Sequence, residues 1–328
     1  MRRTFTKSFL LVVAVLVAAE IAVRVFWSRG LAGRFDYGYH PTAGFVEKSD
    51  GALDLVRAGG RRFFPQHFAQ QRPPGTFRIM VVGDSVPRGP SIAETYSTRL
   101  AEMLRARGIA AEGWNLCLPG YGAHRCHVVL AQALKYQPNL IIRHVNNSNE
   151  YEDEREWQRS QDFQGLHPKN LMMKSLLVRR LHEVKTESVF WSLLPEKIRA
   201  QQGVNDAGAK IIAMTDEKQI RAWQDRVRNF LAEDIAACRE AGVPMLLVTQ
   251  VRLRGSGSQA TLDDSGLDEL ARSFAAPGVE ILPMKDSLPG TDFAPLFMDT
   301  AHLKAPGHDV LAQAIAAKIT PLVQTPVR

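Results

Sequence analysis

Residues 77–89 read FRIMVVGDSVPRG, and this stretch decides the fold. Phe77 to Val82 form a nearly continuous apolar run that ends at Gly83, which is typical of a strand buried on both faces of a sheet. Ser85 follows two residues later, before a helical pattern begins. A serine in such a turn is lifted to the edge of the sheet, with backbone N–H groups of the turn beside it. The stretch therefore predicts a parallel α/β sheet with a serine at its edge.

Strands and helices alternate along the rest of this region. Apolar runs predict strands, and apolar residues at helical spacing predict helices. The expected strands are 77–82, 113–118, 139–145, 243–249 and 279–282, and the expected helices are 93–107, 123–136, 219–240 and 306–322. Such alternation predicts a parallel sheet with helices on both faces. Right-handed crossovers then bring the carboxyl ends of the strands to one edge, where ligands bind in sheets of this kind.

The N-terminus carries a segment long enough to cross a membrane. Ser8 to Trp27 is apolar apart from Glu20 and Arg24, and a helix of this length spans about 30 Å, the thickness of the hydrocarbon core. Glu20 and Arg24 are four residues apart, so on a helix they share a face and can pair. We therefore expect an uncleaved membrane anchor over residues 1–28. A cleaved signal peptide, with Val17-Ala18-Ala19 as its cleavage site, is the alternative.

Both interpretations export the rest of the chain, provided that the cluster of Arg2, Arg3 and Lys7 stays inside. We expect a single-pass protein of the inner (cytoplasmic) membrane with its following domain on the periplasmic side. Residues 29–75 contain many Gly and Pro and only short apolar pieces, which predicts a connector. Residues 76–324 are then the α/β domain.

The charge distribution argues against a nucleic-acid partner. The chain has 328 residues and a formal net charge of +7, but residues 1–78 hold twelve Lys and Arg against five Asp and Glu, while residues 79–328 hold 29 of each. A nucleic-acid-binding domain would carry the basic excess on its folded part. Three cysteines exclude a disulfide-rich scaffold and leave one bridge open, between Cys117 and Cys126.

An insertion at about 151–214 interrupts the alternation after the third strand. Its length and position predict a lid or substrate platform over the same edge of the sheet. Its basic amphipathic piece, Asn170 to Lys185, leaves a second interpretation open, in which this piece is a helix that lies on the membrane.

Three further blocks of sequence could complete a site around Ser85. Asp299 and His302 lie three residues apart before the last helix, so one loop could supply both a general base and the acid that orients it. Gly120 follows the second strand and could present its N–H to an oxyanion. Asn149 follows the third strand and could present a side-chain amide to the same oxyanion.

Taken together and in this order, the four blocks resemble the SGNH, or GDSL-like, hydrolase superfamily. The resemblance implies a flavodoxin-like three-layer α/β/α sandwich. The catalytic triad that it implies consists of Ser85, Asp299 and His302, and the oxyanion hole of the N–H groups of Ser85 and Gly120 with the amide of Asn149. The third block departs from the family, because Asn147 stands where Gly is expected, and this makes Asn147 a rival of Asn149.

The resemblance and the expected export together predict a serine esterase that hydrolyses an acyl or acetyl ester on a cell-envelope glycan, or a related small ester, without a cofactor. Two alternatives use the same fold: an O-acyltransferase with the same triad, and a non-catalytic glycan-binding or assembly protein. A metal enzyme is a third, since His124, Cys126 and His127 lie close in sequence. Only His124 and His127 would face the same way on a helix, however.

Overall fold

The structure is a computed structural model. The residues that it describes are 2–26, 45–58, 61–155, 168, 172, 175–178, 181, 215–255, 259–288, 290 and 292–324. The predicted insertion at 151–214 lies for the most part outside these residues, and so does much of the predicted connector before residue 45.

A five-stranded parallel sheet forms the centre of the protein. Its strands are β4 (Phe77–Gly83), β5 (Ala111–Cys117), β6 (Leu140–Val145), β7 (Met245–Thr249) and β10 (Val279–Pro283). They are arranged in the order β10-β7-β6-β4-β5, with every neighbouring pair parallel. Within this sheet the chain forms β4 first and then β5 on one side of it. The remaining strands follow on the other side, in the order β6, β7 and β10, which is the flavodoxin-like order. The predicted fold class is confirmed, and each predicted strand lies within two residues of an observed one.

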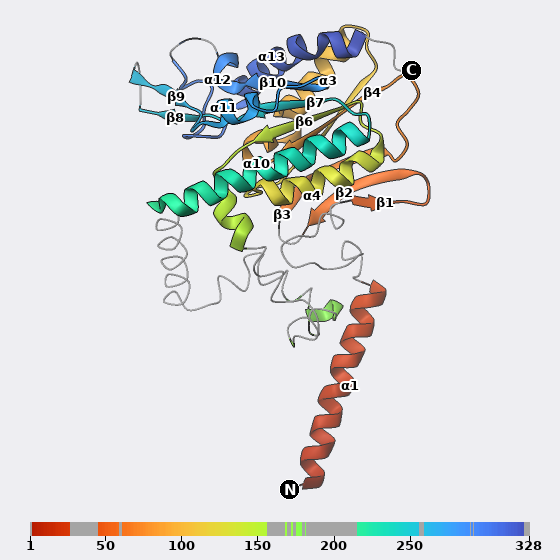
Figure 1. Cartoon of the computed structure of the whole chain (residues 1–328). Coiled ribbons are helices and arrows are strands. Elements are labelled where there is room, and N and C mark those ends of the chain that lie inside the picture. Colours follow the sequence, from red (N-terminus) through yellow and green to blue (C-terminus); the bar gives the residue numbers. More distant parts are fainter. Residues whose placement is uncertain are drawn as a thin grey trace.

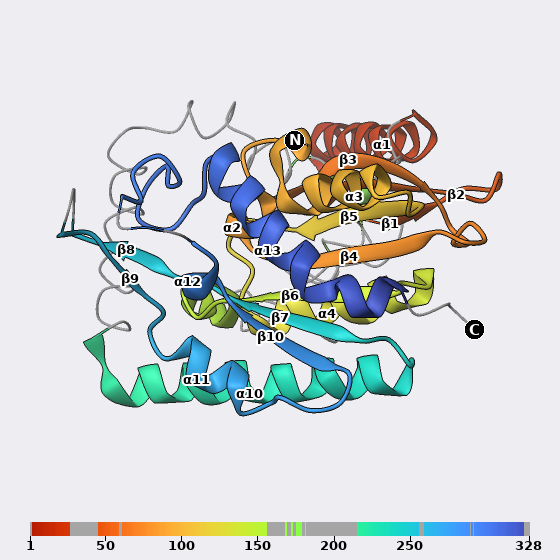
Figure 2. The same ribbon diagram turned by 90° about the horizontal axis from the view of Figure 1, so that it is seen from above.

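Helices cover both faces of this sheet, giving three layers (Figure 1). On one face lie α3 (Tyr96–Ala106) and α13 (Ala305–Gln324), and Figure 2 shows α13 crossing over the strands. On the other face lie α4 (Ala123–Ala133) and α10 (Glu217–Glu240). Shorter elements complete the domain: α2 (Ser85–Arg88), η2 (Ile92–Glu94), η3 (Leu134–Tyr136), β8 (Arg252–Arg254), β9 (Thr261–Asp263), α11 (Leu267–Arg272) and α12 (Met284–Ser287).

The apolar sequence of β4 explains why it occupies the middle of these layers. Successive side chains of a strand point to opposite faces. Met80 and Val82 join the core beneath α4 and α10, whereas Ile79 and Val81 join the core beneath α3 and α13. All four side chains are fully buried. The strand therefore requires apolar residues at consecutive positions, which is the pattern that the sequence shows.

The segment predicted as a connector contains a small antiparallel sheet. Its strands are β1 (Phe45–Glu47), β2 (Ala52–Ala58) and β3 (Arg61–Ala69), in that order. Leu53, Leu55 and Phe63 are buried in the core beneath α4 and α10, and Phe68 stacks on Trp114 of β5 with ring centroids 3.8 Å apart. The short apolar pieces of this segment thus alternate with polar residues, and their apolar side chains cover one side of β5. The boundary at residue 75 stays a prediction.

Helix α1 (Arg2–Phe26) projects away from the α/β layers (Figure 1). Within it, Thr6–Phe26 is 21 residues long and apolar enough to cross a membrane, and only 6% of its most apolar part is buried inside the protein. A signal sequence would have the same length and composition.

Candidate active site

Ser85 is the first residue of α2, directly beyond the carboxyl end of β4. Asp84 caps this short helix, since its side chain accepts a hydrogen bond of 3.0 Å from the backbone N–H of Val86. The turn is tight: a side chain at Gly83 would come within 2.5 Å of Pro87 and 2.9 Å of His144. Glycine before the Asp-Ser pair is therefore required by packing, and it lets α2 start immediately after the strand.

The loop before α13 brings His302 to Ser85. The Nε2 atom of His302 lies 2.8 Å from Ser85 Oγ, and its Nδ1 atom lies 2.7 Å from Asp299 Oδ2. With the ring proton on Nδ1, the imidazole donates to Asp299 and accepts from the serine hydroxyl. Three residues that are separated by as many as 217 positions in sequence thus form one chain of hydrogen bonds.

Asp299 is held in its ionised form by the same loop. Its Oδ1 atom accepts hydrogen bonds of 2.8 Å from the backbone N–H groups of Ala301 and His302. Partial burial opposes ionisation, but these bonds and the one from the His302 ring outweigh it and lower the pKa of Asp299 below its ordinary value. A carboxylate fixed by two N–H groups can orient the imidazole without being displaced.

Asn149 lies beside the Ser85 turn. Its Nδ2 atom donates a hydrogen bond of 2.8 Å to Asp84 Oδ2 and a longer one, 3.4 Å, to the backbone oxygen of Tyr121. Asp84 is 1% exposed. From this buried position its carboxylate accepts hydrogen bonds both from the start of α2 and from the Asn149 amide. The latter hydrogen bond ties the Asn149 amide to the residue that precedes Ser85.

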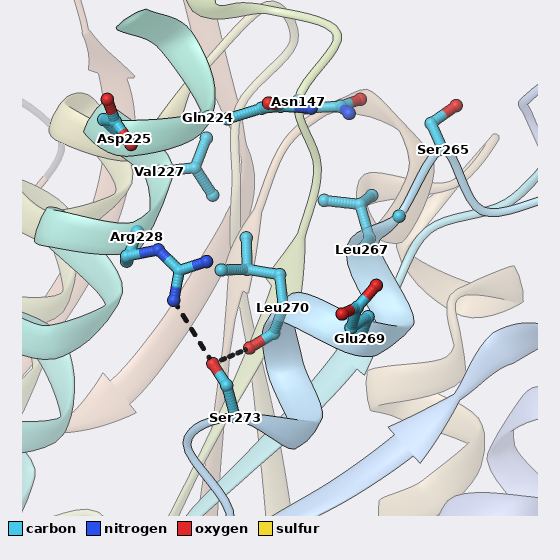
Figure 3. A pocket seen from close by; sticks show the side chains of 11 residues that line it. Asn147, Gln224, Asp225, Val227, Arg228, Ser265, Leu267, Glu269, Leu270 and Ser273 are labelled. Atoms are coloured by element: carbon cyan, nitrogen blue, oxygen red, sulfur yellow. Dashed lines mark hydrogen bonds between the residues drawn. The ribbon is translucent and has the colours of Figure 1, made fainter. Parts of the chain in front are cut away.

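Asn147, the rival in sequence, lies in a different place. It lines a pocket of about 320 Å³ between α10 and α11, together with Gln224 and Arg228. Figure 3 shows Asn147 next to Gln224, on the side of the pocket that faces Ser265 and Leu267. The loop that follows β6 therefore presents Asn147 and Asn149 to two separate regions.

Gly120 follows β5, the neighbour of β4, and its turn reaches the same edge of the sheet. The Leu118 N–H donates to the Gly83 carbonyl at 3.1 Å, which ties this turn to the end of β4. Gly120 has a φ of 73°, in the left-handed region that favours glycine. Its carbonyl accepts a hydrogen bond from the guanidinium of Arg125.

A buried ionic cluster, which the sequence did not predict, lies behind these turns. Arg125 pairs with Asp153, and both side chains are almost completely buried, at 2% and 0% exposure. The Asp153 carboxylate also accepts from the backbone N–H groups of Gly122 and Arg125, at 3.0 and 3.1 Å. Glu150 accepts from the Ala123 N–H at 2.7 Å. The two carboxylates, Glu150 and Asp153, follow Asn149 within four residues of sequence.

The bridge that the sequence leaves open between Cys117 and Cys126 is not formed, and the metal alternative gains no support. Cys117, Cys126 and Cys238 are all free and buried. The His124 ring stacks on the ring of Phe230 in α10, with ring centroids 4.5 Å apart. One of the two histidines is therefore engaged in packing between α4 and α10. Among the residues that the structure describes, no group of three or more His, Cys, Asp or Glu could hold a metal ion.

A cavity of about 300 Å³ opens beside the serine. It is lined by Ser85, Val86, Pro90, Met298, His302 and Leu303, among others. Apolar side chains from two loops thus line an open cavity next to the hydroxyl. Its size suits a short acyl chain.

Comparisons with known proteins find similarity in fold. No family model matches the sequence, and neither does any curated protein. Solved structures that are similar include an acetyl xylan esterase, with 13% identity over 74% of this chain and 100% of that chain, at a TM-score of 0.43. Another is a carbohydrate esterase family 3 protein from Talaromyces cellulolyticus, with 10% identity over 76% of this chain and 100% of that chain, at a TM-score of 0.43. A third is a GDSL-like lipase from Bacteroides thetaiotaomicron VPI-5482, with 9% identity over 77% of this chain and 92% of that chain, at a TM-score of 0.43. Each of these three structures is similar to this chain over about three quarters of its length.

Proposed function

We propose that this protein is a serine hydrolase acting on carboxylic esters. The observation that carries the proposal is the chain of hydrogen bonds from Asp299 through His302 to Ser85, with heavy-atom distances of 2.7 and 2.8 Å. A serine hydroxyl is a weak nucleophile unless a neighbouring base takes its proton. Here the base is within hydrogen-bond distance and is itself oriented by a carboxylate.

In the first half of the reaction, Ser85 Oγ attacks the ester carbonyl carbon while His302 Nε2 takes the hydroxyl proton. The carbonyl oxygen gains a negative charge, which the N–H groups of Ser85 and Gly120 and the Asn149 amide would stabilise. The Asn149 amide has two N–H groups, and the one in the longer bond of 3.4 Å to Tyr121 would turn to the oxyanion. Asp299 stabilises the imidazolium that forms. The bond to the leaving alcohol then breaks, His302 gives its proton to that alcohol, and an acyl-serine ester remains.

In the second half, His302 takes a proton from a water molecule, whose oxygen attacks the acyl-serine carbonyl. The Ser85 oxygen leaves and recovers the proton from His302, which releases a carboxylic acid. Asp299 and His302 have side chains that are 52% and 39% exposed, so water reaches the base directly. This exposure favours hydrolysis over transfer of the acyl group to a sugar hydroxyl.

The substrate that we propose is a short acyl or acetyl ester on a cell-envelope glycan. The cavity of about 300 Å³ beside Ser85 supports a small acyl group. The open rim around His302 leaves room for a large alcohol component such as a sugar. Helix α1 supports a membrane-attached protein, which we propose to be inserted in the inner membrane with its hydrolase domain on the periplasmic side.

The test compares the full-length protein with Ser85→Ala. We expect the native protein to hydrolyse short-chain p-nitrophenyl esters and acetylated glycans and to react with a fluorophosphonate probe, and the variant to do neither. The variant should keep the native melting temperature, because Ser85 is at the edge of the sheet. A native protein without hydrolysis and without labelling would refute the proposal and favour the binding-protein alternative. Acyl transfer to an added glycan that outpaces hydrolysis would instead identify an O-acyltransferase.

A further inference from the structure

Glu20 is an acidic residue within the apolar helix α1, and one turn of the distant insertion surrounds its carboxylate. The Ser175 hydroxyl donates to Glu20 at 2.6 Å, and the backbone N–H groups of Leu176 and Leu177 donate at 2.9 Å each. Arg24, one turn along α1, pairs with the same carboxylate at 2.8 Å. A carboxylate in an apolar helix is costly unless such partners satisfy it.

The contact also satisfies the backbone of the partner turn. The first N–H groups of a helix have no acceptor within the helix. Ser175 accepts from the Val178 N–H at 3.2 Å, and Glu20 accepts from the two N–H groups in between. Every donor of this turn thus has an acceptor, which is what a peptide segment needs in order to leave water.

The position of Glu20 along α1 fixes the depth of this turn. Glu20 lies six residues before Phe26, the end of the apolar span, which corresponds to about 9 Å along a helix. If Thr6–Phe26 crosses a hydrocarbon core of about 30 Å, Leu176, Leu177 and Val178 lie below its outer boundary. These three side chains are all apolar.

The residues on either side of this turn have the same character. Met172 and Leu181 are 59% and 54% exposed, and no part of the described protein covers them. The sequence between and beside them carries Lys174, Arg179 and Arg180. Basic residues close to exposed apolar ones suit the boundary between anionic headgroups and acyl chains.

We propose that the turn at Ser175–Val178, with Met172 and Leu181, is a second membrane contact that enters the outer leaflet of the bilayer beside α1. Its partner is the lipid surface, and Glu20 holds the turn at its depth. This inference rests on α1 crossing the bilayer and does not depend on the ester hydrolase activity. It decides between the two interpretations of the insertion in favour of membrane contact for these residues.

The experiment uses the full-length protein in liposomes that contain anionic phospholipid. Met172→Cys and Leu181→Cys are made one at a time, and each introduced cysteine carries an environment-sensitive nitrobenzoxadiazole label. Ala275→Cys, labelled in the same way, is the matched control. Ala275 is exposed and follows α11, which lies on the side of the domain away from α1 (Figures 1 and 2). The native cysteines are buried, and unsubstituted protein measures any label that they take up.

Labels at 172 and 181 should lose fluorescence to nitroxide-bearing lipids and keep it in aqueous iodide, and the label at 275 should behave in the opposite way. Adding Glu20→Leu should expose both insertion labels to iodide while α1, now more apolar, still resists carbonate extraction. Iodide quenching of labels 172 and 181 in otherwise native protein would overturn the proposal. So would extraction of the native protein by carbonate. Labels that stay in lipid after Glu20→Leu would overturn the role of Glu20.

Discussion

Replacing Asn149 by Ala tests which of Asn147 and Asn149 acts as the oxyanion donor. The structure places Asn149 Nδ2 2.8 Å from the buried carboxylate of Asp84, next to Ser85, while Asn147 lines a pocket between α10 and α11. A donor that acts on the charge of the transition state is worth about 2.7–4 kcal/mol, or 10²–10³ in kcat. Asn149→Ala should therefore lower kcat by that factor and change KM little, because the ground-state carbonyl carries much less charge.

The same substitution has a second, smaller consequence for stability. Asp84 loses one of the two hydrogen bonds from neighbouring groups that it accepts. A hydrogen bond to a charged group contributes about 1.5–3 kcal/mol to the free energy of unfolding. Asn149→Ala should accordingly lower the melting temperature, yet leave the protein folded at the assay temperature.

The matched control is Asn147→Ala, the same change two residues away on the same loop. It should leave kcat for p-nitrophenyl acetate within about twofold of the native value, because Asn147 lies outside the Ser85 site. Both variants are assayed below the lower of their two melting temperatures. The interpretation is refuted if Asn147→Ala loses activity and Asn149→Ala keeps it, since Asn147 would then be the donor.

The remaining predictions concern buried groups. Burial raises the pKa of Asp84 to about 6 from 3.8, so the folded state binds the carboxyl proton more tightly than the unfolded state does. The tighter proton binding stabilises the folded state fully below pH 4, and this stabilisation is lost as the pH rises to 6. In urea titrations, the free energy of unfolding of the native protein relative to Asp84→Asn should therefore fall between pH 4 and 6, and a flat difference would contradict the burial of Asp84. Breaking the pair of Arg125 and Asp153 with Asp153→Asn should cost about 3–5 kcal/mol in the same titration, because it leaves an uncompensated buried charge. Burial raises the pKa of Cys126 and of Cys238 to about 12, so Ellman's reagent at pH 8 should modify neither thiol until the protein is unfolded.

Much of the central sheet could be predicted from the sequence because helices cover both of its faces, so that side chains on both sides of its strands are buried. β4 and β7 contain four consecutive apolar residues each, Ile79–Val82 and Met245–Val248, and β6 begins with three, Leu140–Ile142, before the buried Arg143 and His144. Consecutive apolar residues are needed wherever helices cover both faces. Ser85 and His302 could be placed for a related reason: each lies in a loop that such a sheet brings to its carboxyl edge.

The sheet of residues 45–69 could not be predicted in the same way. Its apolar residues Leu53, Leu55 and Phe63 lie among arginines and next to Gly59-Gly60, which are typical of a loop. What makes them strands is a surface supplied by other parts of the chain. Gln66 exchanges two hydrogen bonds of 2.9 Å with the backbone of Asn115, in β5. Packing that depends on a partner about fifty residues away leaves little local signal.

The ionic cluster behind the candidate site escaped prediction for a further reason, which also bears on how the site would work. Charged residues in helical segments usually face water, so nothing local marks Arg125 and Asp153 as buried. A buried ion pair adds little net stability compared with apolar packing. Here the pair instead fixes backbone: Asp153 holds the N–H of Gly122, and Arg125 holds the carbonyl of Gly120. Donors that stabilise a developing oxyanion act only if they are in place before the charge appears. The buried ion pair behind the turn and the exposed His302 side chain are therefore complementary in the proposed reaction, because the pair would hold the Gly120 turn in place while His302 would exchange protons with substrate and water.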